Sequence, residues 1–450
     1  MDLYAVLTPA KIFDQHLSKA LLKSIFEEEI APGAARGLDG ISVQRFEKRL
    51  DQEIDIVLRK VRNCTYQFTR YREKLIVKSA TKLPRQISIP TIRDKLVLKF
   101  LNRVLSEIYP REINAPPHNM VKRVHTICKG LGKDDAFLRI DIKNFYPTVD
   151  HSILMRVLRR TTRKKQLLTL IERSIETATG TGSTKSEIGI PQGLSISNIL
   201  SSIYLSEIDD YFDGLEDIDY FRFVDDILII GKNERLLELS KELPKLIKKK
   251  RKIECHPIEA GSKSYLSPAD SGVEYLGYEF KLSAVRVRKS SQQKLFTSLM
   301  RVITDLKYNG KKSSALWRLN LRASGCLYKG KKIGWMFYFA QTNDLKQLHW
   351  IDRFIKLRTR TLLRADEQAN LKRFVKSYHE IRFNFENSRY FPNFDNFTDE
   401  EKIEAMLSVN NRLSKTRLEA LDSSDLDFKF QKLISREVSV LEADLFDMFS

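Results

Sequence analysis

The stretch FRFVDDILII, residues 221–230, constrains this chain most, because it puts two adjacent carboxylates between two apolar, β-prone runs. Side chains alternate between the two faces of a strand, so neighbouring acids inside one strand cannot serve the same site. A tight turn between the runs removes that restriction. The pattern therefore predicts a β-hairpin with Asp225 and Asp226 at its tip. Because Asp is common in turns, the pair taken alone is also compatible with an ordinary polar turn.

A third acid gives the pair a chemical role. Asp141 ends the apolar run AFLRID, which indicates a strand, and Asp150 is positioned to cap a helix starting near His151. If these strands are neighbours, three carboxylates meet and repel one another unless cations lie between them. Oxygen-only ligands suit Mg²⁺, which commonly bridges protein carboxylates to substrate phosphates. Two such ions can activate a 3′-hydroxyl and stabilise the leaving pyrophosphate.

The charge distribution points to a polyanionic partner. The 450-residue chain is 42% hydrophobic, enough for a sizeable core, and carries a formal net charge of +20. Residues 281–364 hold 20 Lys and Arg against 3 Asp and Glu, a local +17, whereas residues 365–450 hold 12 against 17, a local −5. We expect nucleic-acid contact in the first segment, with a solvated basic face as the alternative. The second segment suits contact with protein better than contact with phosphate.

The four cysteines are scattered without metal-ligand spacing, which fits reduced thiols in a cytosolic protein. We see no apolar run long enough to span a bilayer and no signal-peptide pattern. The expectation is a soluble, cytoplasmic protein without a membrane partner.

The coarse pattern of elements predicts an α+β core followed by an all-α C-terminal part. The first 60 residues are expected to be mainly helical, and residues 66–90 contain short extended runs. Residues 91–109 have helical apolar spacing. The apolar positions of that helix are Leu96, Phe100, Val104 and Ile108. VEYLGYEF predicts a short strand pair, and the pattern is almost wholly helical from about Ser290.

Six motifs in order resemble those of the reverse transcriptases, specifically the bacterial group with group II intron, retron and phage-defence enzymes. FVDD is similar to the family's (Y/F)xDD hairpin, and DIKNFYPTVD is similar to its first palm motif. GIPQGLSISNILSSIYL resembles the PQG motif, and RQISIPTIRDKLVLKFLNRVL resembles the fingers segment. GLDGIS and YLGYEF resemble the N-terminal GxDG element and the primer-grip hairpin. Together they cover roughly residues 37–280.

The resemblance implies a right-hand polymerase with fingers, a palm containing an antiparallel sheet, and an all-α thumb. Its expected parts are an N-terminal extension and fingers (1–135), a palm (136–285) with a fingers insertion (about 155–188), a basic helical thumb (286–364) and an acidic helical C-terminal extension (365–450).

The resemblance also implies residue roles at the metal site. Asp141 and Asp225 would hold two Mg²⁺ ions, and Asp226 would stand beside them as a supporting catalytic carboxylate and metal-site residue. Tyr146 matches the aromatic residue that lies under the sugar, where a flat ring excludes a 2′-hydroxyl and favours deoxynucleotides. The alternative for Tyr146 is a core aromatic that follows a strand.

Nucleotide contacts follow by the same matching. Gln192 would pack against the incoming nucleotide or the template. Arg85 matches the fingers arginine, whose fork suits triphosphate oxygens, and Lys78 is a second candidate. Lys263 lies where the family often has a lysine that can protonate the leaving pyrophosphate, which makes it a candidate general acid.

Residues 334–364 resemble the stretch where the thumb and maturase helices of intron-type enzymes grip RNA. The candidate RNA- or duplex-binding residues are Lys331, Lys332, Trp335, Arg353 and Arg358. SISN departs from the SxxSP pattern of the intron enzymes and resembles the defence-associated and abortive-infection enzymes. We also expect no nuclease, RNase H or integrase module.

The sequence thus predicts an RNA-directed DNA polymerase that uses Mg²⁺ and dNTPs on a dedicated non-coding RNA in bacterial antiphage defence. Its partners would be the RNA template, the DNA product, and a protein partner or second copy at residues 365–450. Three alternatives stay open: a group II intron-type maturase, an untemplated polymerase of the abortive-infection type, and a palm that only binds RNA.

Overall fold

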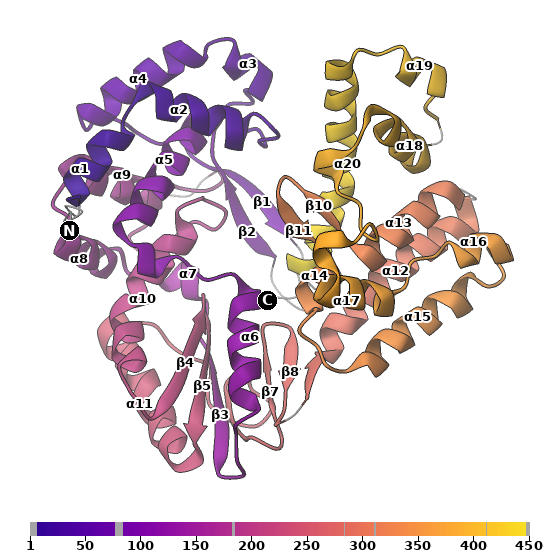
Figure 1. Cartoon of the computed structure of the whole chain (residues 1–450). Coiled ribbons are helices and arrows are strands. Elements are labelled where there is room, and N and C mark those ends of the chain that lie inside the picture. The colour runs from indigo at the N-terminus through magenta and orange to yellow at the C-terminus, as the bar shows by residue number, and fades with distance from the viewer. Residues whose placement is uncertain are drawn as a thin grey trace, which may run out of the picture. The chain divides into compact units, whose positions relative to one another are not determined.

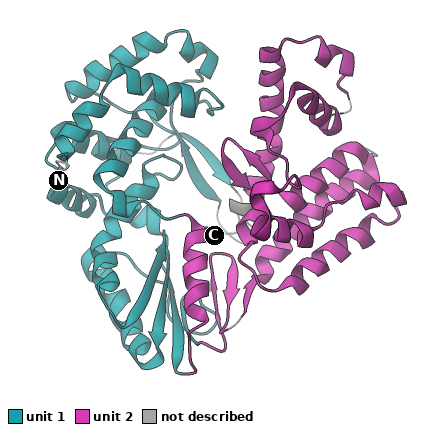
Figure 2. Ribbon diagram, viewed as in Figure 1, with its two compact units in different colours: residues 1–115, 134–268 teal, residues 116–133, 269–450 magenta. Residues whose placement is uncertain are grey.

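The computed structural model describes residues 7–76, 84–181, 185–282, 284–309, 312–410 and 412–446. It divides the chain into two compact units (Figure 2). Unit 1 combines residues 1–115 with 134–268, and unit 2 combines residues 116–133 with 269–450. Each unit has a hydrophobic core of its own. The expected division into fingers, palm, thumb and C-terminal extension is not tested by these two units and stays a prediction.

The N-terminal part of unit 1 is mainly helical, as expected (Figure 1). Its helical elements are α1 (Pro9–His16), α2 (Lys19–Ile25), the π-helical η1 (Phe26–Ile30), α3 (Val43–Glu47), α4 (Leu50–Arg62), α5 (Ile92–Ile108) and the 3-10 turn η2 (Pro110–Glu112). Strands β1 (Arg72–Ile76) and β2 (Arg85–Ile89) form an antiparallel pair between α4 and α5 in the chain. The predicted helix over 91–109 is therefore confirmed as α5, which the Thr91 side chain caps.

An antiparallel sheet forms the second part of unit 1. Its strand order is β4 (Ile218–Phe223), β5 (Asp226–Lys232), β3 (Asp135–Asp141) and β6 (Tyr265–Pro268). The accompanying helices are α7 (Phe145–Thr148), α8 (His151–Thr161), α9 (Lys165–Glu176), α10 (Ser197–Asp213) and α11 (Asn233–Arg251). Asp150 caps α8 as predicted, because its Oδ1 accepts a hydrogen bond from the Ile153 amide at 3.1 Å.

The register of this sheet decides which side chains share a face. Leu138 and Ile140 of β3 join Ile227 and Ile229 of β5 in the core that α10 and α11 cover. Because side chains alternate along a strand, Asp141 projects from the opposite face of the sheet. The expected α+β class is confirmed by this antiparallel sheet and by the helices around it.

Unit 2 is mostly helical. It contains α6 (Pro117–Cys128), a sheet of β7 (Val273–Tyr275), β8 (Tyr278–Phe280) and β9 (Val285–Val287), and a hairpin of β10 (Cys326–Tyr328) and β11 (Lys331–Ile333). Its further helices are α12 (Lys289–Asn309), α13 (Lys312–Ser324), α14 (Trp335–Phe339), α15 (Leu345–Thr359), α16 (Ala365–Ala369), α17 (Phe374–Phe383), the 3-10 turns η3 (Phe385–Asn387) and η4 (Phe394–Asn396), α18 (Asp399–Val409), α19 (Lys415–Glu419) and α20 (Ser423–Phe446).

Two features of unit 2 go beyond the sequence pattern. The β10–β11 hairpin interrupts the region expected to be almost wholly helical, and its turn uses positive φ at Lys329 (51°) and Gly330 (66°). The acidic C-terminal segment shares a core with the basic segment before it, since Leu321 lies in one cluster with Phe430 and Ile434. None of the described helices is both long and apolar enough to cross a membrane.

Candidate active site

The acidic hairpin exists, but only one of its two acids lies in the turn. Val224 and Asp225 form the two-residue connection, and Asp226 is the first residue of β5, opposite Phe223. The prediction that both acids sit at the tip is therefore wrong for Asp226, which is part of the ladder. Val224 has a φ of 58°. That conformation is strained for a β-branched residue, so the surrounding contacts must hold the turn in place.

The register brings Asp141 to the hairpin. Asp141 of β3 lies directly opposite Asp226 of β5, and the Ile142 amide donates to the Asp225 carbonyl at 3.0 Å. The expected neighbouring strand is thus confirmed. Burial raises the pKa of Asp225 to about 6, and the negative charges of Asp141 and Asp226 add to that increase. The three carboxylates form one repulsive cluster, which favours the binding of cations there.

Cationic side chains already offset part of this charge. The Arg139 guanidinium, from the same face of β3, donates from Nε and Nη2 to the two oxygens of Asp226 at 2.9 and 3.0 Å. Lys263 donates from Nζ to Asp141 Oδ1 at 3.0 Å. His256 Nε2 lies 3.2 Å from the same oxygen. Sequence reasoning identified Lys263 but missed His256. Nothing in the local sequence indicates that His256 lies beside Asp141 at the end of β3.

The donor chemistry of Asp141 and Asp225 fits Mg²⁺, since both supply hard oxygen ligands close to one another. Asp226 differs, because both of its oxygens face Arg139. Within the described part of the chain, no group of three or more His, Cys, Asp or Glu side chains is arranged to hold a metal ion. The geometry therefore agrees with a supporting role for Asp226 and gives no support to its prediction as a metal ligand.

Tyr146 lies beside these acids. Its hydroxyl donates to Asn198 Oδ1 in α10 at 2.7 Å, and its carbonyl accepts from the Ile190 amide at 2.8 Å. Burial raises the pKa of Tyr146, the negative charge of Asp225 raises it further, and the positive charge of Arg85 lowers it. The charges of Asp225 and Arg85 therefore both act on the Tyr146 hydroxyl. Asn198 was not singled out from the sequence, because only the packing of α7 against α10 brings it to the ring.

The PQG loop packs directly on β2. The Ser88 amide donates to the Gln192 carbonyl at 2.7 Å. Gly193 has a φ of 100°, and a Cβ there would lie 2.7 Å from Cγ2 of Ile87. Glycine is required at this point because the loop approaches the strand so closely. Arg85 starts the same strand and is exposed. Lys78 lies outside the described residues.

A buried ion pair supports the hairpin from the α10 side. Arg222 of β4 is only 7% exposed, and its Nε donates to Asp209 Oδ1 at 2.7 Å. Its Nη1 donates to the carbonyl of the strained Val224 at 3.0 Å. Tyr220 also donates to Asp209 Oδ1, at 2.8 Å. The turn that carries Asp225 is thus tied to α10 through one guanidinium.

The predicted RNA-binding residues lie on three elements of unit 2. Lys331 and Lys332 are exposed on β11, and Arg353 and Arg358 are exposed on α15. Trp335 is different, because it is only 3% exposed. Its ring packs against Phe339 and Phe374, with centroids 4.6 and 5.6 Å away. Burial leaves the Trp335 ring no surface for duplex contact, so that assignment is corrected to a core residue.

The segment that carries this site is similar to a known family. Residues 76–280 match the family described as reverse transcriptase (RNA-dependent DNA polymerase). This span contains β3, the hairpin, α10 and the PQG loop. The matched segment resembles a reverse transcriptase domain, and the pairing of Asp141 with the acidic hairpin lies inside it.

Individual relatives share only part of their length with this chain. YkfC of Escherichia coli (strain K12) is 28% identical over 189 residues, which cover 39% of this chain and 49% of YkfC. The group II intron-encoded protein LtrA of Lactococcus lactis subsp. cremoris is 25% identical over 169 residues, covering 36% of this chain and 28% of LtrA. The chain thus spans less than half the length of these two relatives.

A solved structure shows a weaker likeness. Telomerase from Candida albicans, in complex with a fragment of telomeric RNA, aligns with 89% of this chain and 69% of its own at 13% identity and a TM-score of 0.42. That degree of likeness is too low to carry a functional argument.

Proposed function

We propose that this chain is an RNA-directed DNA polymerase that synthesises DNA from dNTPs. One observation carries the proposal: the register of the sheet joins Asp141 to the Asp225 turn inside the segment that matches the reverse transcriptase family. The burial and mutual repulsion of these acids suit divalent cations better than they suit a structural role.

In this proposal Asp141 and Asp225 would hold two Mg²⁺ ions. When bound, such ions activate the 3′-hydroxyl and stabilise charge on the leaving pyrophosphate. Asp226 would act as a supporting carboxylate, kept in one orientation by the two hydrogen bonds from Arg139. Lys263, whose Nζ lies 3.0 Å from Asp141 Oδ1, is near enough to donate a proton to the leaving group.

Substrate selection would rest on the side chains around Tyr146. Its ring would lie under the sugar and exclude a 2′-hydroxyl, and the hydrogen bond to Asn198 would keep the ring in place. Arg85 would contact triphosphate oxygens with its fork, with Lys78 as a second cation. Gln192 would contact the incoming nucleotide or template, from a loop tied to β2 by the Ser88 amide.

The test is Asp225→Asn, which keeps the side-chain shape and removes the charge. We expect DNA synthesis on an annealed RNA template and DNA primer to fall at least about a hundredfold. Asp219→Asn is the matched control, since Asp219 lies on β4 and is exposed. It should leave the rate unchanged. Wild-type rates in the Asp225→Asn variant, with both variants folded, would refute the assignment of the metal site.

We further propose that the template is a dedicated non-coding RNA and that the enzyme serves antiphage defence in the bacterial cytoplasm. The support is the SISN departure from the intron-type pattern. Residues 365–450 would provide a protein contact, either to a partner or to a second copy. The second candidate is a group II intron-type maturase, which the similarity to the intron-encoded protein LtrA favours.

Sequencing the RNA that co-purifies with the protein, together with the DNA made from it, separates these readings. One defined transcript with complementary DNA supports the dedicated-template reading. Enrichment of a group II intron RNA supports the maturase. DNA unrelated to any bound RNA means untemplated synthesis and would refute the RNA-directed reaction.

A further inference from the structure

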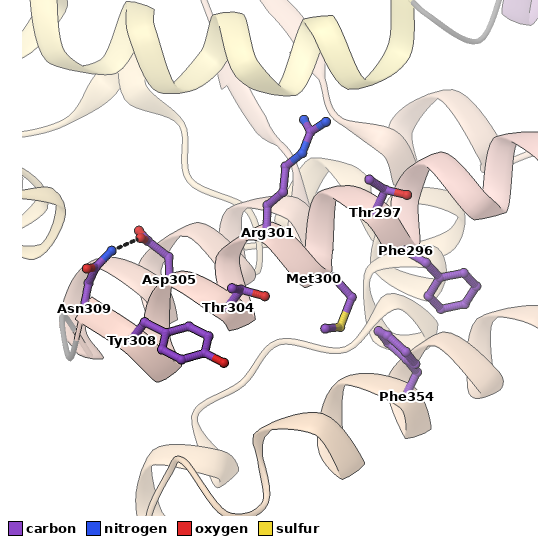
Figure 3. A pocket seen from close by; sticks show the side chains of 9 residues that line it. All are labelled: Phe296, Thr297, Met300, Arg301, Thr304, Asp305, Tyr308, Asn309 and Phe354. Atoms are coloured by element: carbon purple, nitrogen blue, oxygen red, sulfur yellow. Dashed lines mark hydrogen bonds between the residues drawn. The ribbon is translucent and has the colours of Figure 1, made fainter. Parts of the chain in front are cut away.

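Helices α12 and α15 of unit 2 border an open groove of about 640 Å³ (Figure 3). Most of its lining comes from one side of α12, with one residue from α15. The lining residues are Phe296, Thr297, Met300, Arg301, Thr304, Asp305, Tyr308, Asn309 and Phe354. Figure 3 shows Phe296, Met300 and Phe354 gathered at one end of the groove, with Tyr308 near the other end.

The groove presents aromatic rings to solvent. The Phe296 ring lies edge-on to Phe354 and to the neighbouring Trp350, with centroids 4.7 and 5.0 Å apart. Trp350 is 58% exposed and Tyr308 is 73% exposed. Tyr308 lines the groove, and Trp350 adjoins it through its contact with Phe296. Large aromatic surfaces that stay open to water in and beside one groove mark a binding surface rather than a core.

Cations accompany these rings. The Lys307 ammonium lies 5.1 Å from the centroid of the Tyr308 ring, and the Arg358 guanidinium lies 5.7 Å from the centroid of Phe354. Each of the two helices carries more basic than acidic residues. The acids present are already engaged: Asp305 accepts from the Asn309 amide, and Asp352 accepts from the backbone amides of residues 374 and 375. The net charge beside the rings is therefore positive.

We propose that this groove binds single-stranded RNA, with bases stacked on Phe296, Trp350 and Tyr308 and with phosphates held by neighbouring Lys and Arg side chains. Alternating aromatic and basic groups are the surface that unpaired, flexible strands require. A duplex cannot use these rings, because its bases are stacked on one another inside the helix. Phe296 and Tyr308 are twelve positions apart on α12 and therefore about 18 Å apart along its axis, which leaves room for more than one nucleotide.

The choice of RNA rests on the proposed function, in which RNA is the template, whereas the preference for an unpaired strand rests on the rings alone. The groove would then hold template RNA that is not yet paired with DNA. A protein partner is the competing occupant, but the positive charge beside the rings favours a polyanion.

The experiment compares the full chain with Trp350→Ala/Tyr308→Ala, using fluorescence anisotropy of a labelled, unstructured RNA of about 12 nucleotides. Both side chains are largely exposed, so the fold should persist, which circular dichroism checks. Phe428→Ala is the matched control, since Phe428 is 64% exposed on α20 and is not among the residues that line the groove. We expect the double variant to bind RNA more than about tenfold more weakly and the control to bind within about twofold. Binding of a blunt duplex should not change.

Three outcomes would overturn the inference. Equal RNA binding by the double variant and the control excludes stacking on these rings. A parallel loss of duplex binding indicates a loss of charge attraction or of structure rather than stacking. A change in self-association by sedimentation, with RNA binding intact, assigns the groove to a protein contact.

Extension of a short annealed primer provides the separate check on the proposed function. Groove-dependent RNA binding without any DNA synthesis would refute the polymerase and leave this inference standing. DNA synthesis by a protein whose RNA binding does not depend on the groove would support the polymerase and refute this inference.

Discussion

Arg222 offers a sharp test of how the acidic turn is held. Its guanidinium pairs with Asp209 and donates to the carbonyl of Val224, whose φ of 58° is unfavourable. A β-branched residue in that region costs about 1–2 kcal/mol. A hydrogen bond from a charged donor contributes about 1.5–3 kcal/mol, so this one bond is enough to offset the strain. Without it, the turn should relax and move Asp225.

The perturbation is Arg222→Met. It leaves the Asp209 carboxylate, 18% exposed, without its cation, and a buried ion left unpaired costs about 3–5 kcal/mol in the free energy of unfolding. Arg235→Met is the matched control, because the Arg235–Asp217 pair has side chains 30% and 54% exposed. A surface pair of this kind contributes only about 0–1 kcal/mol.

A double variant separates stability from positioning. Arg222→Met/Asp209→Asn removes the unpaired charge and keeps an acceptor for Tyr220, so most of the lost stability should return. The Val224 carbonyl still lacks its donor, so DNA synthesis should remain at least about tenfold below the wild type.

The assays are urea denaturation and primer extension. All three tryptophans, Trp317, Trp335 and Trp350, lie in unit 2, so unfolding of unit 1 is best followed by circular dichroism. Amide hydrogen exchange should report faster opening of β4 and β5 in Arg222→Met and in Arg222→Met/Asp209→Asn, since both lack the donor to the Val224 carbonyl. If the double variant regains stability and full DNA synthesis together, the idea that Arg222 positions the turn is refuted.

Two further predictions concern the sugar and pH. Tyr146→Ala should raise the use of ribonucleotides relative to deoxynucleotides about tenfold or more in kcat/KM, and an unchanged ratio would remove its gating role. Burial, followed by the charge of Asp209, raises the pKa of Glu112 from 4.5 to about 7, while Arg222 opposes the rise. The folded state therefore holds this proton more tightly, and Glu112 destabilises the fold increasingly as pH rises through that interval. Because Glu112 is only partly buried and solvent screens its charge, Glu112→Gln should recover about 1–2 kcal/mol in the free energy of unfolding at pH about 8 and little at pH about 4, measured by urea denaturation. Equal gains at both pH values would contradict this origin.

Local patterns predicted much of the fold. The strand ending at Asp141, the cap at Asp150 and the acidic hairpin each depend on a few consecutive residues, and all three are present. The β10–β11 hairpin was missed because its strands are only three residues long and are surrounded by helical sequence. Its Lys329–Gly330 turn was the available signal.

The polar contacts of the site were harder to foresee. Arg139 faces Asp226 only because of the strand register, and His256 reaches Asp141 only because residues 255–256 run alongside the end of β3. Such pairings depend on tertiary placement and leave no mark on sequence spacing. For Trp335 the sequence predicted a contact that the structure does not allow. Its position within a basic stretch suggested a contact residue, but packing against neighbouring rings buries it.

The pairing of β3 with β5 also determines when the acid cluster can assemble during translation. Asp141 is synthesised well before Asp226, and α7 to α10 are made in the interval between them. During translation the first acid therefore has no partner strand, and closing so long a loop is a slow step in folding. Lys263 and Ser264, which both contact Asp141, arrive later still. A growing chain therefore cannot assemble this acid cluster until nearly all of unit 1 has left the ribosome.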